Sequence, residues 1–329
     1  MAKPYTLNIF SYFWGMINQP KAIVILSLFL FFISEAYSQT TNEKKEKPTY
    51  FKKQVELLHD NDFLLFTDWY YTTGSFISYR ILLNELEEVR YKRQIEFSLS
   101  QEYYTPSNVE SEDIEDFDRP YAGYSALTSK LTFSNNNYLL DFTFQMGVSG
   151  AISGAEGFQS WFHSTNESKD PSWIGQIDDA VHANFYANYT KEWKFLPKPF
   201  SVHAAWRSGL AMGTKDIFIQ NQALFYFGKR NDIMNTMAYR QLGEVRPEFF
   251  FVVKFAYRYV MHDGLLEGII VGDNSEFVLD PINNVFIYGI EGFYRKRRME
   301  FKLGYNYSSR KAPTTDLHTW ITLSVARNF

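Results

Sequence analysis

Apolar and polar residues alternate with a period of two through most of the chain after residue 50. Ile95, Phe97 and Leu99, for example, are separated by Glu96 and Ser98. A strand with this pattern has one apolar and one polar face, which suits a barrel wall between lipid and lumen. Such segments lie near residues 52–62, 72–83, 91–104, 122–134, 138–149, 179–194, 199–212, 217–229, 245–261, 283–295, 299–308 and 317–329.

These segments predict an all-β fold, a transmembrane antiparallel β-barrel of about twelve strands, an even number as in bacterial outer-membrane barrels. A soluble β-sandwich also alternates, but its outward face would be the polar one. Burying so many aromatic positions in a sandwich would leave few partners for Arg80, Glu96 and Asp141. The last segment ends on Phe329, which resembles the insertion signal of bacterial outer-membrane proteins. We therefore expect the barrel-assembly machinery to be a partner.

The N-terminal region has the features of a signal for export. Lys21 precedes an apolar run over residues 22–33, and Ala36 and Ser38 form a small-residue cleavage site. The run is too short for a spanning helix, which needs about 20 apolar residues. We expect a signal peptide at 1–38, a disordered polar leader at 39–50 and the barrel at 51–329.

Composition narrows the classes of function. The chain has no cysteine, a net charge of −4, 31 Phe and 23 Tyr. A disulfide framework is excluded, and the absence of a basic stripe or a His/Cys cluster argues against nucleic acid and structural zinc. High aromatic content without long apolar runs is typical of an outer-membrane barrel.

The loop lengths predict which end of the barrel faces outward. Both termini of an even-stranded barrel lie on the periplasmic side, where the turns are generally short. The long connections near 61–72, 104–121 and 150–178 then face the cell exterior. The stretch 230–244 would be a long periplasmic connection, for which the sequence suggests only an insertion.

The third outward loop contains a predicted helix. The period of two lapses between residues 154 and 164, and Gln159 and His163 are four apart. On a helix these two side chains would share one face. His163 could therefore meet groups from the other loops, although a polar rim residue is the simpler interpretation of an isolated histidine.

The order of motifs resembles the outer-membrane lipid A 3′-O-deacylase family over essentially the whole mature chain. The motifs are Asn61-Asp62, Tyr71-Thr72-Thr73-Gly74, Tyr104-Thr105-Pro106, Asp118-Arg119-Pro120-Tyr121-Ala122-Gly123 and Gln159-x-x-x-His163. The resemblance implies an esterase whose histidine base is His163, with Gln159, Asn61 and Thr72 completing the catalytic group and Ca²⁺ as cofactor. The family's lysine after the Tyr-x-Pro segment has no counterpart, because Glu110, Glu112 and Glu115 stand there.

The residues also support this chemistry without the family. A neutral histidine oriented by an amide or a carboxylate is a competent general base. Asp62, with Asp60 and Asp68 nearby, could hold a hard cation through oxygen ligands, and Asn61 or Thr72 could stabilise an oxyanion directly. Asn61 and Thr72 could equally be turn formers.

We also expect substrate contacts from three further rim residues, Arg119, Gln101 and Trp173. Arg119 has a second interpretation of equal weight, a structural turn with a salt bridge. The predicted substrate is lipid A of the outer leaflet, reached by an active site at the extracellular rim. The alternatives are a phospholipase or another glycolipid esterase, and a non-catalytic barrel of the same family.

Overall fold

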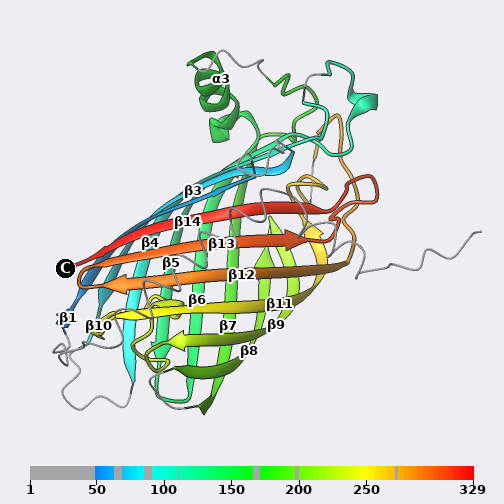
Figure 1. Ribbon diagram of the computed structural model, residues 1–329. Coiled ribbons are helices and arrows are strands. Elements are labelled where there is room, and N and C mark those ends of the chain that lie inside the picture. The colour runs from blue at the N-terminus through cyan, green and yellow to red at the C-terminus, as the bar shows by residue number, and fades with distance from the viewer. Residues whose placement is uncertain are drawn as a thin grey trace, which may run out of the picture. The chain divides into compact units, whose positions relative to one another are not determined.

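The computed structural model describes residues 49–62, 69–84, 91–109, 111–165, 171–196, 200–270 and 273–329. The expected signal peptide and all of the expected leader but Thr49 and Tyr50 lie outside these residues. Among the described residues, twelve antiparallel strands form one closed barrel (Figure 1). The predicted fold class and strand number are confirmed.

Each barrel strand pairs with its neighbours in the chain, and β14 closes the barrel on β2. β9 is followed in the barrel by β11. The strands are β2 (Lys53–Asn61), β3 (Tyr70–Leu82), β4 (Lys92–Thr105), β5 (Ala122–Ser134), β6 (Tyr138–Ser149), β7 (Ala180–Leu196), β8 (Ser201–Gly213), β9 (Asp216–Lys229), β11 (Glu248–Asp263), β12 (Asn284–Lys296), β13 (Met299–Ser308) and β14 (His318–Asn328).

The alternation of each strand divides its residues between the wall's two faces. On β4, Ile95, Phe97 and Leu99 point outward, and Leu99 is 60% exposed. The polar positions between them, such as Gln94 and Glu96, are buried inside. An exposed apolar face around a polar interior is the arrangement that lipid requires of a barrel.

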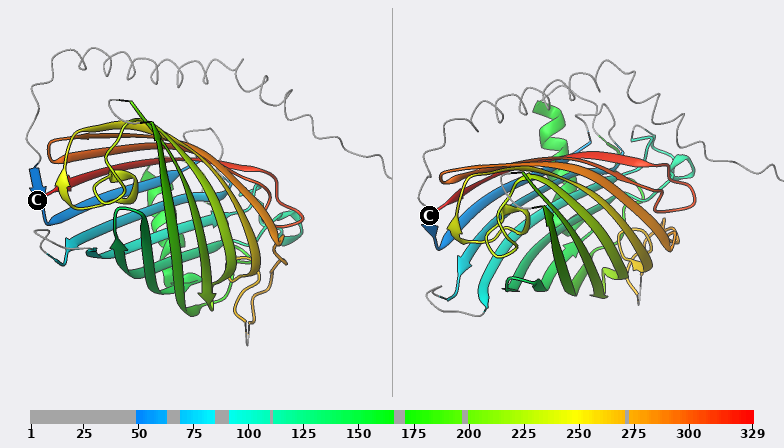
Figure 2. Two further views of the ribbon diagram at one scale, coloured as in Figure 1. Left: turned by 90° about the horizontal axis from the view of Figure 1, so that it is seen from below. Right: turned by 60° about the horizontal axis from the view of Figure 1, so that its bottom comes forward.

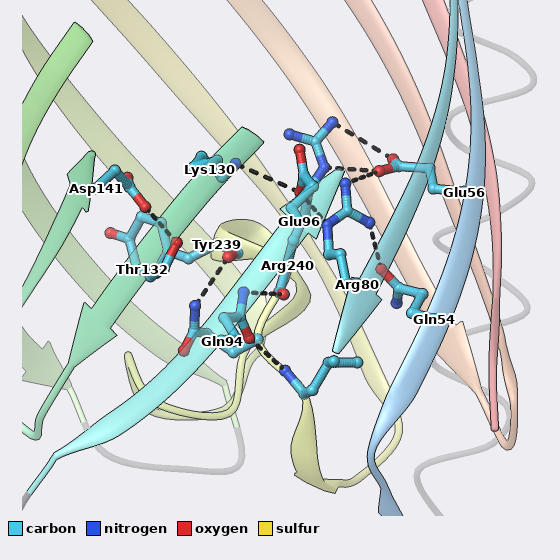
Figure 3. Close-up of polar contacts among 12 residues, drawn as sticks. Gln54, Glu56, Arg80, Gln94, Glu96, Lys130, Thr132, Asp141, Tyr239 and Arg240 are labelled. Carbon is cyan, nitrogen blue, oxygen red and sulfur yellow. Dashed lines mark hydrogen bonds and ion pairs between the residues drawn. The ribbon is translucent and has the colours of Figure 1, made fainter. Parts of the chain in front are cut away.

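A network of ion pairs and hydrogen bonds lies inside the barrel (Figure 3). Arg80 is 1% exposed, and its guanidinium donates to Glu96, to Glu56 at 2.5 Å and to Gln54 at 2.5 Å. Lys130 lies 3.5 Å from the same Glu96 carboxylate. Buried charges are tolerated only when they are paired, so this network explains how charged residues occupy the inside of the four adjacent strands β2 to β5.

The long connection 230–247, which we call the plug segment, folds back into the barrel at the end where β14 terminates (Figure 2). It contains the 3-10 helix η4 (Met237–Tyr239) and strand β10 (Gly243–Val245), which pairs with β1 (Thr49–Phe51). Its residues bond to five barrel strands: Arg240 to Glu56 at 2.8 Å, Lys92 to Asn235 at 2.9 Å, Ser134 to Gln241 at 2.7 Å, Tyr239 to Glu192 at 2.8 Å and Arg295 to the Asn235 carbonyl at 2.8 Å. The stretch 230–244, for which the sequence suggested only an insertion, therefore lies inside the barrel and occupies part of the lumen.

The opposite end of the barrel, which we call the loop end, bears the longer connections. The connection between β6 and β7 contains the 3-10 helix η3 (Ala151–Ser153) and helix α3 (Ala155–Thr165), and the one between β4 and β5 contains η2 (Ile114–Asp116). The helix expected between 154 and 164 is confirmed. Within the described part of the chain, no helix is long and apolar enough to cross a membrane.

Candidate functional site

A row of four residues faces outward on the wall at the loop end. Asn61, Thr73, Tyr103 and Gly123 are successive partners across β2, β3, β4 and β5. Each has the outward parity of its strand, and the Asn61 side-chain amide donates to the Thr73 hydroxyl at 3.0 Å. We call these four residues the site row, and two of them, Asn61 and Thr73, bring polar side chains to the lipid-facing side of the wall.

A β-bulge redirects Thr72, the residue next to Thr73 of the site row. The pairing of β3 with β4 shifts register between Tyr71 and Thr73, so Thr72 is an extra residue. Its hydroxyl lies 2.8 Å from that of Thr105, which has the same outward parity as Tyr103. Bulges are frequent beside functional sites because they redirect a side chain.

Asp62 directly follows the site row. Its backbone N–H donates to the Thr72 carbonyl at 3.2 Å, and its Oδ2 accepts the Trp69 N–H at 3.0 Å. The residue is fully buried. The expected catalytic residues Asn61 and Thr72 and the expected metal ligand Asp62 are therefore brought together by β2, β3 and the loop between them.

Helix α3 begins directly on the wall at Gly123. A Cβ atom on Gly123 would lie 2.2 Å from the Ser153 hydroxyl and 2.4 Å from the Ala155 Cβ. The Ser153 carbonyl accepts hydrogen bonds from Gln101 at 3.2 Å and from Ser125 at 2.7 Å. The chain just before α3 is thus fixed to β4 and β5, and Figure 1 shows the helix rising outside the wall. Gln101 is a wall residue that tethers this segment.

An aromatic cluster supports the start of α3 from the loop side. Trp173 is 4% exposed, and its ring centre lies 5.2 Å from that of Tyr121. Tyr103, Phe117 and Ala155 complete this buried cluster. Trp173, expected as a substrate contact, packs here against Tyr121 in the cluster that also contains Ala155, the first residue of α3.

Gln159 and His163 lie on α3 as their spacing predicted. Gln159 is 8% exposed, whereas Phe158 and Trp161 on the same helix are at least half exposed. Phe158 packs with its ring centre 6.2 Å from that of Tyr103 in the site row. The His163 side chain lies outside the described residues; its backbone position is one helical turn beyond Gln159.

Arg119 lies on the lumen side, apart from the site row. Its guanidinium carbon is 4.8 Å from the ring centre of Tyr104, an inward residue of β4, and it donates to the Leu265 carbonyl at 3.2 Å. Lys311, in the loop after β13, lies 5.9 Å from the same ring, and burial lowers its pKa to about 8. Both cations therefore lie beside the inward-facing ring of Tyr104.

The carboxylates near Asp62 are only partly available for a cation. Asp60 accepts hydrogen bonds from Tyr71 at 2.9 Å and Thr322 at 2.5 Å inside the barrel, and Asp68 lies outside the described residues. In the ranges that the structure describes, no three His, Cys, Asp or Glu side chains form a metal-binding group. Asp62 itself is a buried carboxylate, and carboxylate oxygens are ligands that suit a hard cation.

Sequence reasoning missed the residues that position α3, namely Gly123, Ser125, Tyr103 and Ser153. A signal for Gly123 was present, because a glycine within a strand often marks the close approach of another backbone. The others carry no local signal, since their role depends on which loop folds over which strand.

Comparisons with known proteins agree with this architecture. A family model described as outer membrane protein LpxR matches residues 24–329. Among solved structures, LpxR from Salmonella typhimurium superposes with a TM-score of 0.72 at 16% identity, covering 84% of this chain and 100% of that one. The β domain of the Bordetella autotransporter BrkA covers 85% of this chain and 100% of its own at 7% identity and a TM-score of 0.45. No curated protein matches the chain in sequence.

Proposed function

This chain belongs to the LpxR family of outer membrane proteins, and on that premise we propose that it is an esterase that removes an acyl chain from lipid A. The main support for the proposal is the site row, which presents polar groups on the lipid-facing side of the wall. The start of α3 packs against this row at Gly123. A lipid whose ester group lies level with the site row would reach the site without leaving the membrane. The resemblance in sequence points to the 3′ ester and to the extracellular rim.

The proposed reaction is hydrolysis by an activated water. His163 takes a proton from water, and the water oxygen bonds to the ester carbonyl carbon. The bond from that carbon to the sugar oxygen then breaks, and the proton passes to the sugar oxygen, which leaves a fatty acid and a sugar hydroxyl. Gln159, on the same helical face, orients the histidine, and Asn61 and Thr72 supply hydrogen bonds near the developing oxyanion.

Ca²⁺ is the cofactor that the proposal includes, and Asp62 is the residue that would hold it. When bound, the cation would supply positive charge for the oxyanion, a role that the absent family lysine does not fill. Asn61 and Thr72, beside Asp62, offer further oxygen atoms of the kind that calcium binds.

The function is tested by mass spectrometry of lipid A and phospholipids from cells with and without this protein. We expect lipid A lighter by one acyl chain in the expressing cells and unchanged phospholipids. Loss of a phospholipid chain would instead identify a phospholipase, and unchanged spectra for both lipid classes would identify a non-catalytic member of the family. Chelation of divalent cations during an assay of purified protein should stop the release of fatty acid.

Replacing Gly123 by alanine should reduce this activity by about 10²-fold, because even a displacement of about 1 Å can have that effect on catalysis. The new methyl group would overlap Ser153 and Ala155 and push α3 off the wall. Fatty-acid release by the purified variant measures the effect. Gly157→Ala is the matched control, since nothing lies within 4 Å of its Cβ position. Equal rates of fatty-acid release by the two variants would show that the contact of α3 with Gly123 does not position the site.

A further inference from the structure

A hollow of about 630 Å³ lies in the outer face of the wall, across strands β3 to β7. Two consecutive rows of paired, outward residues form most of it. The upper row is Ser75, Gln101, Ser125, Val148 and Val181, and the lower row is Ile77, Leu99, Leu127 and Met146. The volume falls in the range of about 300–1,000 Å³ that is usual for ligand sites.

The hollow exists because small side chains occur where the next outward residues of the same strands are large. Ser75 and Ser125 have outward parity on β3 and β5, at positions where neighbouring outward residues are Ile77 and Leu127. Ile77 and Leu127 are 56% and 57% exposed and form the lower, apolar border. The lining is predominantly apolar, so a hydrocarbon chain fits it better than a headgroup does.

The hollow lies next to the site row on the same strands. Ser75, Gln101 and Ser125 lie two residues from Thr73, Tyr103 and Gly123 on the same three strands, which corresponds to about 7 Å along the wall. Gln101 and Ser125 also hold the Ser153 carbonyl beneath the start of α3. A chain lying in the hollow would therefore have one end at the site row and would extend down the lipid-facing wall.

We propose that this hollow binds the hydrocarbon of the acyl chain that is cleaved and selects its length. This inference rests on the proposed function, because only an ester held at the site row gives the chain a defined starting point. A chain bound there exchanges contact with fluid lipid for contact with a fixed apolar surface. A pocket of fixed size discriminates between chains by about 10- to 200-fold per methylene that it fails to accommodate.

The first test fills the hollow with Ser125→Leu and, separately, Ser75→Leu. The substrates are lipid A preparations with short, medium and long ester-linked chains, and the measured quantity is kcat/KM for each. We expect at least a tenfold fall for the long chain relative to the short chain in both variants. Ala223→Leu, an outward position on β9, is the matched control and should keep the wild-type length profile. An unchanged profile in the filled variants would overturn the proposal.

A second measurement separates this inference from the proposed function. Lipid A with a photoreactive diazirine at the middle of its ester-linked chain is cross-linked to the wild-type protein, and the labelled residues are identified by mass spectrometry. We expect labels to concentrate on Leu127 and Met146 and to decrease in Ser125→Leu. Labels spread evenly around the wall would overturn the hollow as a binding site even if hydrolysis occurs. Concentrated labels without any hydrolysis by the wild type would instead contradict the proposed function alone.

Discussion

Replacing His163 by alanine is expected to slow fatty-acid release from lipid A by about 10²- to 10⁴-fold, the usual contribution of a general base. The physical reason is that water is a poor nucleophile unless a positioned group removes its proton. His163 lies one turn beyond Gln159, which is buried, on a helix whose start is fixed to the wall. The measurement is the rate of release by purified protein in lipid vesicles.

A second histidine on the same wall provides the matched control. His59 is exposed on β2, and its Nδ1 lies 3.1 Å from the Ser75 hydroxyl. His59→Ala should keep nearly the full rate if His163 is the base. If His59→Ala lost activity while His163→Ala kept it, the general base would be His59 on β2, and α3 would have no catalytic role.

Arg80→Met should lower the free energy of unfolding by about 3–5 kcal/mol, the typical effect of breaking a buried ion pair. Arg80 bonds to Glu56, Glu96 and Gln54, and its removal leaves two carboxylates inside the barrel. Arg240 and Lys130 neutralise these carboxylates only in part, because each contacts one of them. Urea titration of the protein refolded in lipid vesicles measures the change.

The exposed pair of Lys194 and Asp232 gives the comparison for this prediction. Its atoms lie 3.2 Å apart, but the side chains are 40% and 61% exposed. Lys194→Met should therefore change stability by less than about 1 kcal/mol. If both variants unfold at the same urea concentration, the lumenal network contributes specificity of packing rather than stability.

The strands could be predicted because their pattern is local. Each residue's face follows from its parity alone, so Leu99 outside and Glu96 inside are readable without knowing the neighbouring strands. The helix that contains Gln159 could also be predicted from a local pattern, because the alternation of apolar and polar residues is interrupted over its length. Motifs such as Asn61-Asp62 indicated where the site would lie along the chain.

The composition of the site depended on contacts between distant segments. The sequence placed Arg119, Trp173 and Asn61 alike at the outward end of the barrel. In the structure, Arg119 lies on the lumen side beside Tyr104, whereas Trp173 packs in the cluster at the start of α3. Asp60 is two residues from Asp62 but is held by Tyr71 and Thr322 within the barrel. Loop residues have no parity, so sequence spacing does not decide which partners they meet.

The barrel, its strands, the inward and outward residues of each strand and the helix near residue 160 could all be predicted from the chain alone, because they follow from periodicity within single segments. The bulge at Thr72, the contact of α3 with Gly123 and the position of residues 230–247 inside the barrel became visible only in the folded molecule. The physical reason is that these features arise from the register between strands and from loops folding over them. Both are set by interactions between residues far apart in the chain, which no local pattern encodes.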